Sequence, residues 1–81
     1  MQKQEHLIKE DVIFENVEKV FDWITDAREA LFKLDLKRAR QIYTEIITAY
    51  NKLNPAEQRI VYKEVKDLYE ERKKAERLFM H

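Results

Sequence analysis

Residues 34–57, LDLKRARQIYTEIITAYNKLNPAE, hold two helix boundaries and the whole of the helix between them. Asp35 is a residue type that caps a helix N-terminus, so a helix ahead of it has to end just before it. At the second boundary Asn54 can cap the next helix, and Pro55 suits its first position. Glu57 sits where a capping box places its acidic residue. The stretch therefore predicts three helices joined by two short turns.

Ahead of this stretch, residues 11–34 have the pattern of a long amphipathic helix, and residues 1–10 are expected to extend it or fray. Apolar residues recur alternately four and three positions apart, with aromatic residues on both flanks. At about 100° per residue the apolar arc exceeds roughly 180°, so this helix should contact two others. The stripe consists of Ile13, Val17, Val20, Ile24, Ala27, Leu31 and Leu34.

The two later helices are predicted at residues 36–53 and 55–80. The first directs Leu36, Ala39, Ile42, Tyr43, Ile46, Ala49, Tyr50 and Leu53 inward, and the second Val61, Val65, Leu68, Arg72, Ala75 and Phe79. Because short connections make sequential helices antiparallel neighbours, the fold class is all-α, an antiparallel up-down-up three-helix bundle over residues 11–81.

The chain has 81 residues, which allows one domain, with no glycine and a single proline. Glycine is the usual residue where a backbone needs positive φ or has to approach a phosphate closely. Its absence argues against tight hairpins and nucleotide-binding loops.

The sixteen Lys+Arg balance sixteen Asp+Glu, so no net charge draws the chain to nucleic acid or an anionic membrane. There is no cysteine, hence no disulfide and no thiolate metal site. No run of about 18 apolar residues exists, and the polar start MQKQEH is not a secretory signal. We therefore expect a cytoplasmic protein without membrane insertion, and the composition is typical of a thermophilic, archaeal-like source.

The four tyrosines share a register. If the last two helices fold back about the Asn54-Pro55 turn, position numbers of facing residues have a nearly constant sum, which pairs Tyr50 with Tyr62 and Tyr43 with Tyr69. These rings either close the bundle edge with hydroxyls in water or line a groove for a partner segment. For the groove we expect flanking charges from Arg40, Lys66 and Lys73.

Other candidate sites have weaker support. His6 and His81 lie at opposite ends of the chain, so we expect neither to bind metal, and no cofactor is expected. Arg28 and Arg72 either pack at the rim of the bundle or pair with a partner's carboxylate. An acidic line on the first helix is either a solvated face or a docking surface for a basic partner, and it consists of Glu18, Asp22, Asp26 and Glu29. A helix face offers no cavity that would separate two carboxyl pKa values, so we expect no enzymatic activity.

The first two helices resemble a tetratricopeptide-repeat hairpin. Trp23, Ala27, Ala39 and Tyr43 match that repeat's aromatic and small positions over about one repeat. The sequence departs from the repeat at Asp26, Ala30 and Ile46, and its proline, Pro55, comes four residues late.

Most of the chain is also similar to MIT domains, three-helix bundles that bind short helical motifs of partner proteins. The Ala39-x-x-Ile42-Tyr43 run and the closing segment over 69–78 carry this likeness. The family's Asp-x-Gly-x-Tyr turn is missing, and residues 35–39 read DLKRA instead. The resemblance implies peptide docking in a groove between helices.

We therefore expect a small non-enzymatic module that binds a helical or peptide segment of a partner protein. One alternative is a structural homodimerisation domain, since small domains with wide apolar arcs often gain stability by association. Another is a nucleic-acid-binding regulator that uses the basic patch Lys37, Arg38 and Arg40, although nucleic acid is the less favoured partner.

Overall fold

The computed structural model describes residues 2–79, with side chains described for residues 15–79. Three helices, α1 (Gln2–Phe32), α2 (Leu36–Lys52) and α3 (Pro55–Phe79), account for nearly all of that range, and it contains no strand. The prediction of an all-α chain with three helices is confirmed. The side-chain predictions for His6, Ile13 and His81 lie outside the described residues.

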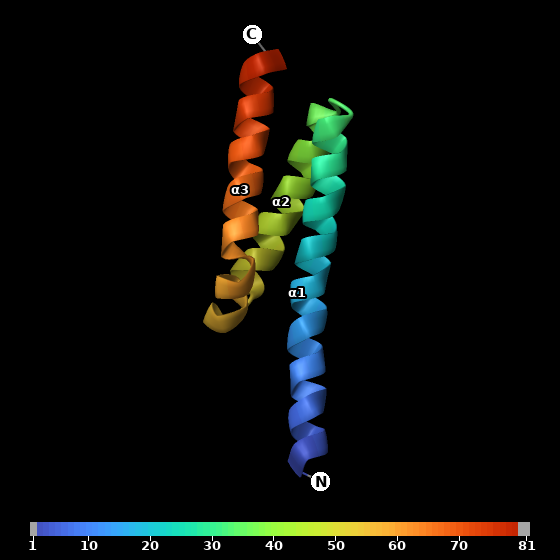
Figure 1. The fold of residues 1–81 in the computed structure, drawn as a ribbon, viewed down its shortest axis with the longest axis vertical. Coiled ribbons are helices and arrows are strands. Elements are labelled where there is room, and N and C mark those ends of the chain that lie inside the picture. The colour runs from blue at the N-terminus through green and yellow to red at the C-terminus, as the bar shows by residue number, and fades with distance from the viewer. Residues whose placement is uncertain (1, 80–81) are drawn as a thin grey trace.

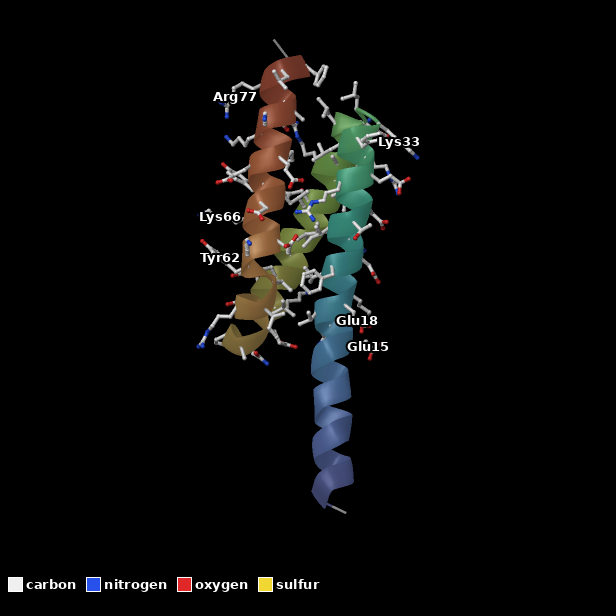
Figure 2. All side chains as sticks on the ribbon, in the orientation of Figure 1. Glu15, Glu18, Lys33, Tyr62, Lys66 and Arg77 are labelled. Carbon is white, nitrogen blue, oxygen red and sulfur yellow. The ribbon has the colours of Figure 1, made fainter. Side chains whose placement is uncertain are left out.

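The helices form an elongated body of 59 × 19 × 15 Å in which each helix packs against both others. In Figure 1 the connection between α1 and α2 lies at the same end as the C-terminus of α3, while the α2–α3 turn lies near the middle of the long axis. Glu15 lies near the level of that turn (Figure 2), so the first turns of α1 project beyond the bundle. The three-way packing occupies the C-terminal half of α1.

The core agrees with the predicted apolar stripes. The α1 stripe contacts both other helices, as its wide arc predicts, and Val20, Ile46 and Val61 are completely buried. Apolar burial of this kind contributes roughly 25 cal/mol per Å², which makes these rows the main source of stability. The core cluster is Val17, Val20, Ile24, Ala27, Ile46, Val61, Val65 and Leu68.

The α2–α3 turn has the capping box that the sequence predicts. The side-chain oxygen of Asn54 accepts from the N–H of Glu57 at 2.9 Å, and a Glu57 carboxylate oxygen accepts from the N–H of Asn54 at 2.9 Å. Pro55 occupies the first helical position, where its missing N–H costs nothing. Gln58 adds a bond from its side-chain amide to the carbonyl of Tyr50 at 3.0 Å. We call residues 50–60 the turn end of the bundle.

The α1–α2 connection is built differently. The N–H of Leu34 donates to the carbonyl of Leu31 at 3.0 Å, and the N–H of Asp35 donates to that of Ala30 at 2.8 Å. This pair of bonds is a Schellman motif. Its C′ residue, the first residue past the C-cap, has a left-handed backbone conformation and is therefore usually glycine. Here Leu34 takes that conformation, with φ 61°. α1 therefore ends at Phe32, two residues before the predicted end near Leu34, and the placement of Leu34 in the apolar stripe is wrong, since Leu34 is exposed.

Asp35 caps α2 as predicted, accepting from the N–H of Arg38 at 3.2 Å. The C-terminus of α3 lies at the same end of the molecule as this connection (Figure 1), and its last residue, Phe79, is 58% exposed, although the sequence pattern predicts that it faces inward. Neither α1 nor α2 covers the last turn of α3 there. We call residues 33–40 and 72–79 the open end of the bundle.

Candidate functional site

An open, largely apolar groove of about 390 Å³ runs between α2 and α3. Its walls are mainly aromatic and aliphatic, which is the usual character of a binding groove. Lys66 and Glu70 stand at its rim. We call it the tyrosine groove, and its lining is Tyr43, Ile47, Tyr50, Tyr62, Val65, Lys66, Tyr69 and Glu70.

All four tyrosines reach this groove because of helical spacing and the tight α2–α3 turn. Residues seven apart lie on nearly the same helix face, which aligns Tyr43 with Tyr50 and Tyr62 with Tyr69. The rings of Tyr43 and Tyr69 meet with centroids 6.1 Å apart and planes at 41°, a favourable tilted geometry. The predicted Tyr43–Tyr69 pairing is therefore present, and Tyr50 and Tyr62 border the same groove.

The Tyr43–Tyr69 pair is held by an arginine from α3. The guanidinium carbon of Arg72 lies 4.8 Å from the Tyr43 ring centroid and 5.9 Å from that of Tyr69. Its side chain is only 15% exposed, and Nη1 donates to Glu76 at 2.6 Å. Burial raises the pKa of the Tyr43 hydroxyl, and the nearby Arg72 charge partly offsets this. Stacking on an arginine fixes the two rings and leaves them little freedom to rearrange.

Glu76 connects this cluster to α2. It accepts from Arg40 at 3.2 Å as well as from Arg72. Burial alone would raise the pKa of Glu76, but the hydrogen bond from Arg40 and the charges of both arginines outweigh it and hold that pKa below its ordinary value. Arg40, predicted as a charge flanking the groove, is therefore engaged within the protein.

The two predicted lysines lie closer to the groove. Lys66 lines it, and Figure 2 shows Lys66 and Tyr62 on the side of α3 that faces away from α1. The ammonium of Lys73 lies 5.5 Å from the Tyr69 ring centroid. Tyr62 and Tyr69 are 55% and 40% exposed, and no tyrosine hydroxyl bonds to another side chain within residues 15–79. The rim can thus offer cations and hydroxyls to an occupant.

Sequence reasoning missed three lining residues, Ile47, Val65 and Glu70, although it placed Val65 in the apolar stripe of the last helix. Ile47 follows Tyr43 by four positions and precedes Tyr50 by three, so helical spacing places it on the tyrosine face. Glu70 neighbours Tyr69 and follows Lys66 by four. Extending the i, i+4, i+7 pattern from each tyrosine would have found Ile47.

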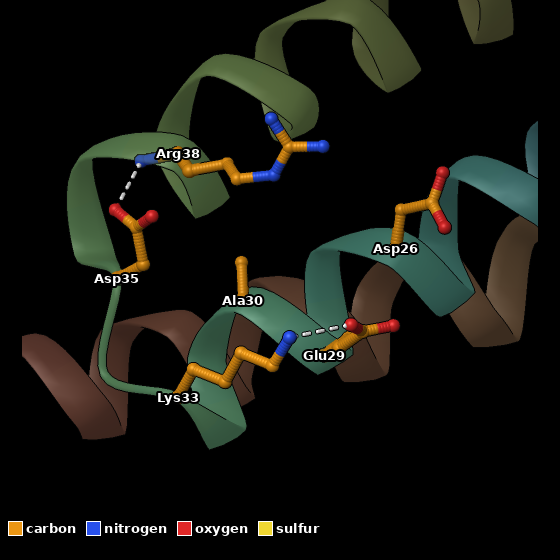
Figure 3. A pocket seen from close by; sticks show the side chains of 6 residues that line it. All are labelled: Asp26, Glu29, Ala30, Lys33, Asp35 and Arg38. Carbon is orange, nitrogen blue, oxygen red and sulfur yellow. Dashed lines mark hydrogen bonds and ion pairs between the residues drawn. The ribbon is translucent and has the colours of Figure 1, made fainter.

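A second hollow of about 400 Å³ lies beside the α1–α2 connection (Figure 3). Two of its charged groups pair with each other, Lys33 with Glu29 at 2.9 Å, and the Asp35 carboxylate accepts from the backbone N–H of Arg38. The hydrogen bond from Lys33 lowers the pKa of the Glu29 carboxyl. No group of three or more potential metal ligands occurs in the described part of the chain. Its lining is mainly charged, in contrast to the tyrosine groove, and consists of Asp26, Glu29, Ala30, Lys33, Asp35 and Arg38.

Arg28 is used to join α1 to α3. Its guanidinium bonds to Glu71 at 3.0 Å and to Glu64 at 3.0 Å, two carboxylates seven residues apart on one face of α3. The bond to Glu71 is the main cause of its raised pKa. Arg28 and Arg72 therefore both find carboxylates inside the protein.

Comparisons with protein-family models, with curated proteins and with solved structures give no match for this chain. Within the described residues, no helix combines the length and apolar character needed to cross a bilayer. The functional interpretation of the tyrosine groove therefore rests on the geometry of the groove alone.

Proposed function

We propose that this chain is an antiparallel up-down-up three-helix interaction module whose tyrosine groove binds the apolar face of a helical segment from a partner protein. The observation that carries the proposal is the gathering of four tyrosines from two helices along one groove that nothing within residues 15–79 covers. An enzymatic role would need a cavity that separates the pKa values of two carboxyl groups, whereas this groove is open and largely apolar, so the module is proposed to be non-enzymatic.

Aromatic side chains suit such a groove because they give large contact areas at a low entropic cost. Tyrosine is enriched at binding hot spots, where its ring packs and its hydroxyl stays hydrated or bonds across the interface. A helix laid in a groove presents anchors at i, i+3 or i+4, and i+7. That spacing matches the seven-residue interval between Tyr43 and Tyr50 on α2, and between Tyr62 and Tyr69 on α3.

The charges at the rim of the groove indicate which charges the bound segment carries beside its apolar face. Lys66 and Lys73 stand beside the groove, and Glu70 is the one acidic residue in its lining. Lysines at a rim favour acidic neighbours on the bound segment and speed the encounter more than they add affinity. We therefore propose an amphipathic helix with acidic residues beside its apolar stripe.

The proposal agrees with the resemblance to tetratricopeptide hairpins and MIT domains, in which grooves between helices receive peptides. In this chain the support comes from the Tyr43–Tyr69 contact and from Arg72, which fixes that contact from inside the bundle.

The test uses peptides selected from a random-sequence display library against the full chain. We expect selected peptides with apolar residues at helical spacing and Asp or Glu beside them. Their affinity should fall by about tenfold or more in the Tyr50→Ala/Tyr62→Ala double variant. The single variant Tyr62→Ala, at a 55% exposed side chain, should keep the wild-type melting temperature within a few degrees and still weaken binding.

Ile60→Ala is the matched control, because Ile60 is on α3, is 50% exposed and lies outside the groove lining. It should leave peptide affinity unchanged. If Tyr62→Ala binds like Ile60→Ala, or if the tyrosine variants lose stability and affinity to the same degree, the tyrosines close the bundle edge and the proposal fails. A groove occupied by a second copy would appear as a concentration-dependent dimer in sedimentation that Tyr62→Ala dissociates.

A further inference from the structure

The balanced net charge of the chain conceals a strong charge asymmetry. The open end, residues 33–40 and 72–79, holds eight of the sixteen Lys+Arg and two of the sixteen Asp+Glu, a net charge of +6. The rest of the chain holds the other eight cations and fourteen acids, a net charge of −6. Two segments far apart in sequence supply the cations in equal numbers.

The fold brings these two segments together. Arg40 of α2 bonds to Glu76 of α3 at 3.2 Å, and Lys33 and Arg77 lie at the same end in Figure 2. Both acids of the open end are already engaged, because Glu76 pairs with two arginines and Asp35 caps α2.

Several cations of the open end remain available. Within residues 15–79, none of these four side chains forms an ion pair: Lys37, Arg38, Lys74 and Arg77. Asp26 and Glu29 of α1, which line one hollow with Lys33 and Arg38, offset part of the positive potential of this end, and these four cations leave the rest.

The same end exposes large apolar side chains. Phe32, the last residue of α1 and directly before the open end in sequence, is 89% exposed, and Leu34 in the connection is 53% exposed. Leu78 and Phe79 in the last turn of α3 are 66% and 58% exposed. Single exposed apolar residues are ordinary, but four gathered at one end mark an interaction surface.

We propose that the open end docks on the surface of a bilayer rich in anionic lipid, with Phe32, Leu34, Leu78 and Phe79 entering the headgroup region. Basic clusters of four to eight Lys/Arg are attracted to anionic leaflets, and exposed apolar side chains beside them add burial at the interface. Exposed aliphatic and aromatic side chains with cations around them are the combination that binds the surface of an anionic bilayer.

Two other occupants fit this end less well. A second copy meeting it end to end would bring two +6 charges together, which opposes association. Nucleic acid would pair with the cations, but exposed leucines have no counterpart on a phosphate backbone. The tyrosine groove lies along the side of the bundle, so docking by the end would leave it accessible and the two proposals can fail separately.

The experiment is co-sedimentation of the full chain with vesicles of phosphatidylcholine and phosphatidylserine at a 7:3 ratio, and with vesicles of phosphatidylcholine alone. We expect binding to the anionic vesicles at 0.05 M salt, and little binding to the neutral ones or at 0.5 M salt. Lys37→Glu/Arg38→Glu should weaken binding by about tenfold or more, since each basic residue near such a surface contributes about fivefold. Phe32→Ser/Leu78→Ser should weaken it by about tenfold.

The matched controls lie elsewhere on the bundle: Ile60→Ser for the apolar change and Lys63→Glu for the charge change. Both should bind anionic vesicles like the wild type, and helical circular dichroism should confirm that every variant is folded. Absence of binding to anionic vesicles at low salt overturns the proposal, as does equal binding by the open-end variants and their controls. Binding that persists in Phe32→Ser/Leu78→Ser and is competed by duplex DNA would reassign the cations to nucleic acid. Self-association lost in Phe32→Ser/Leu78→Ser would reassign the apolar residues to a second copy.

Discussion

The turn end and the open end of the bundle close their helices by different means. At the turn end, Asn54 and Glu57 satisfy each other's backbone groups, and Gln58 reaches back eight residues to Tyr50. At the open end, a leucine takes a conformation that usually belongs to glycine, and Glu76 joins helices across 36 residues of sequence. The turn end is closed by neighbours along the chain. The open end depends on tertiary contacts and leaves apolar side chains in water.

The largest expected effect is at the turn end. Glu57 is 5% exposed and accepts the N–H of Asn54. Glu57→Ala should lower the free energy of unfolding by about 1–3 kcal/mol, because it leaves that donor unpaired at a buried position. Urea denaturation followed by circular dichroism measures the loss.

Glu57→Gln is the matched control, since a capping box accepts glutamine as well as glutamate. It should keep most of the stability. An equal loss in both variants would mean that the charge, and not the hydrogen bond, closes this end.

The next effect is at the open end and depends on pH. Glu76→Gln removes the charge that two arginines share and should cost about 1 kcal/mol at pH 7. Because the pKa of Glu76 is lower in the folded protein than in the unfolded chain, its contribution is complete above the unfolded pKa. It disappears as pH falls through the folded pKa.

The stability difference between wild type and Glu76→Gln should therefore be full at pH 7 and shrink below about pH 4, measured by urea denaturation at each pH. A difference that stays constant down to pH 3 would contradict the assignment of the low pKa to this carboxyl.

The smallest effect is a gain. Leu34 has φ 61° and is 53% exposed, so replacing it sacrifices little packing. Leu34→Gly should raise the free energy of unfolding by about 0.5–1 kcal/mol, because the relief of left-handed strain exceeds the added freedom of the unfolded chain. Leu34→Ala keeps the strain and should show no gain. A melting temperature for Leu34→Gly at or below that of Leu34→Ala would exclude this account.

The features of the fold that could be predicted from the sequence are those formed by residues close together in the chain. Asp35, Asn54, Pro55 and Glu57 act within one helical turn, so their roles could be assigned from spacing alone. The exposure of Leu34 could not be predicted in this way, because its left-handed conformation is tolerated only when surrounding hydrogen bonds fix it.

The candidate site divides in the same way. Seven-residue spacing and a short turn were enough to predict that Tyr43 would face Tyr69. Spacing could not show that Arg72 would lie against both rings, or that Glu76 would bond to Arg40. Those outcomes depend on which long side chain reaches which carboxylate once the helices have packed.

The sequence by itself determined the number of helices, the α2–α3 turn and the Tyr43–Tyr69 pairing, because helical periodicity and capping act over a few residues. Only the tertiary structure decided that residues 33–40 and 72–79 form one cationic, apolar end and that an arginine fixes the tyrosine groove. The physical reason is distance: contacts between helices depend on their packing, and a composition with zero net charge does not say where in space its charges gather.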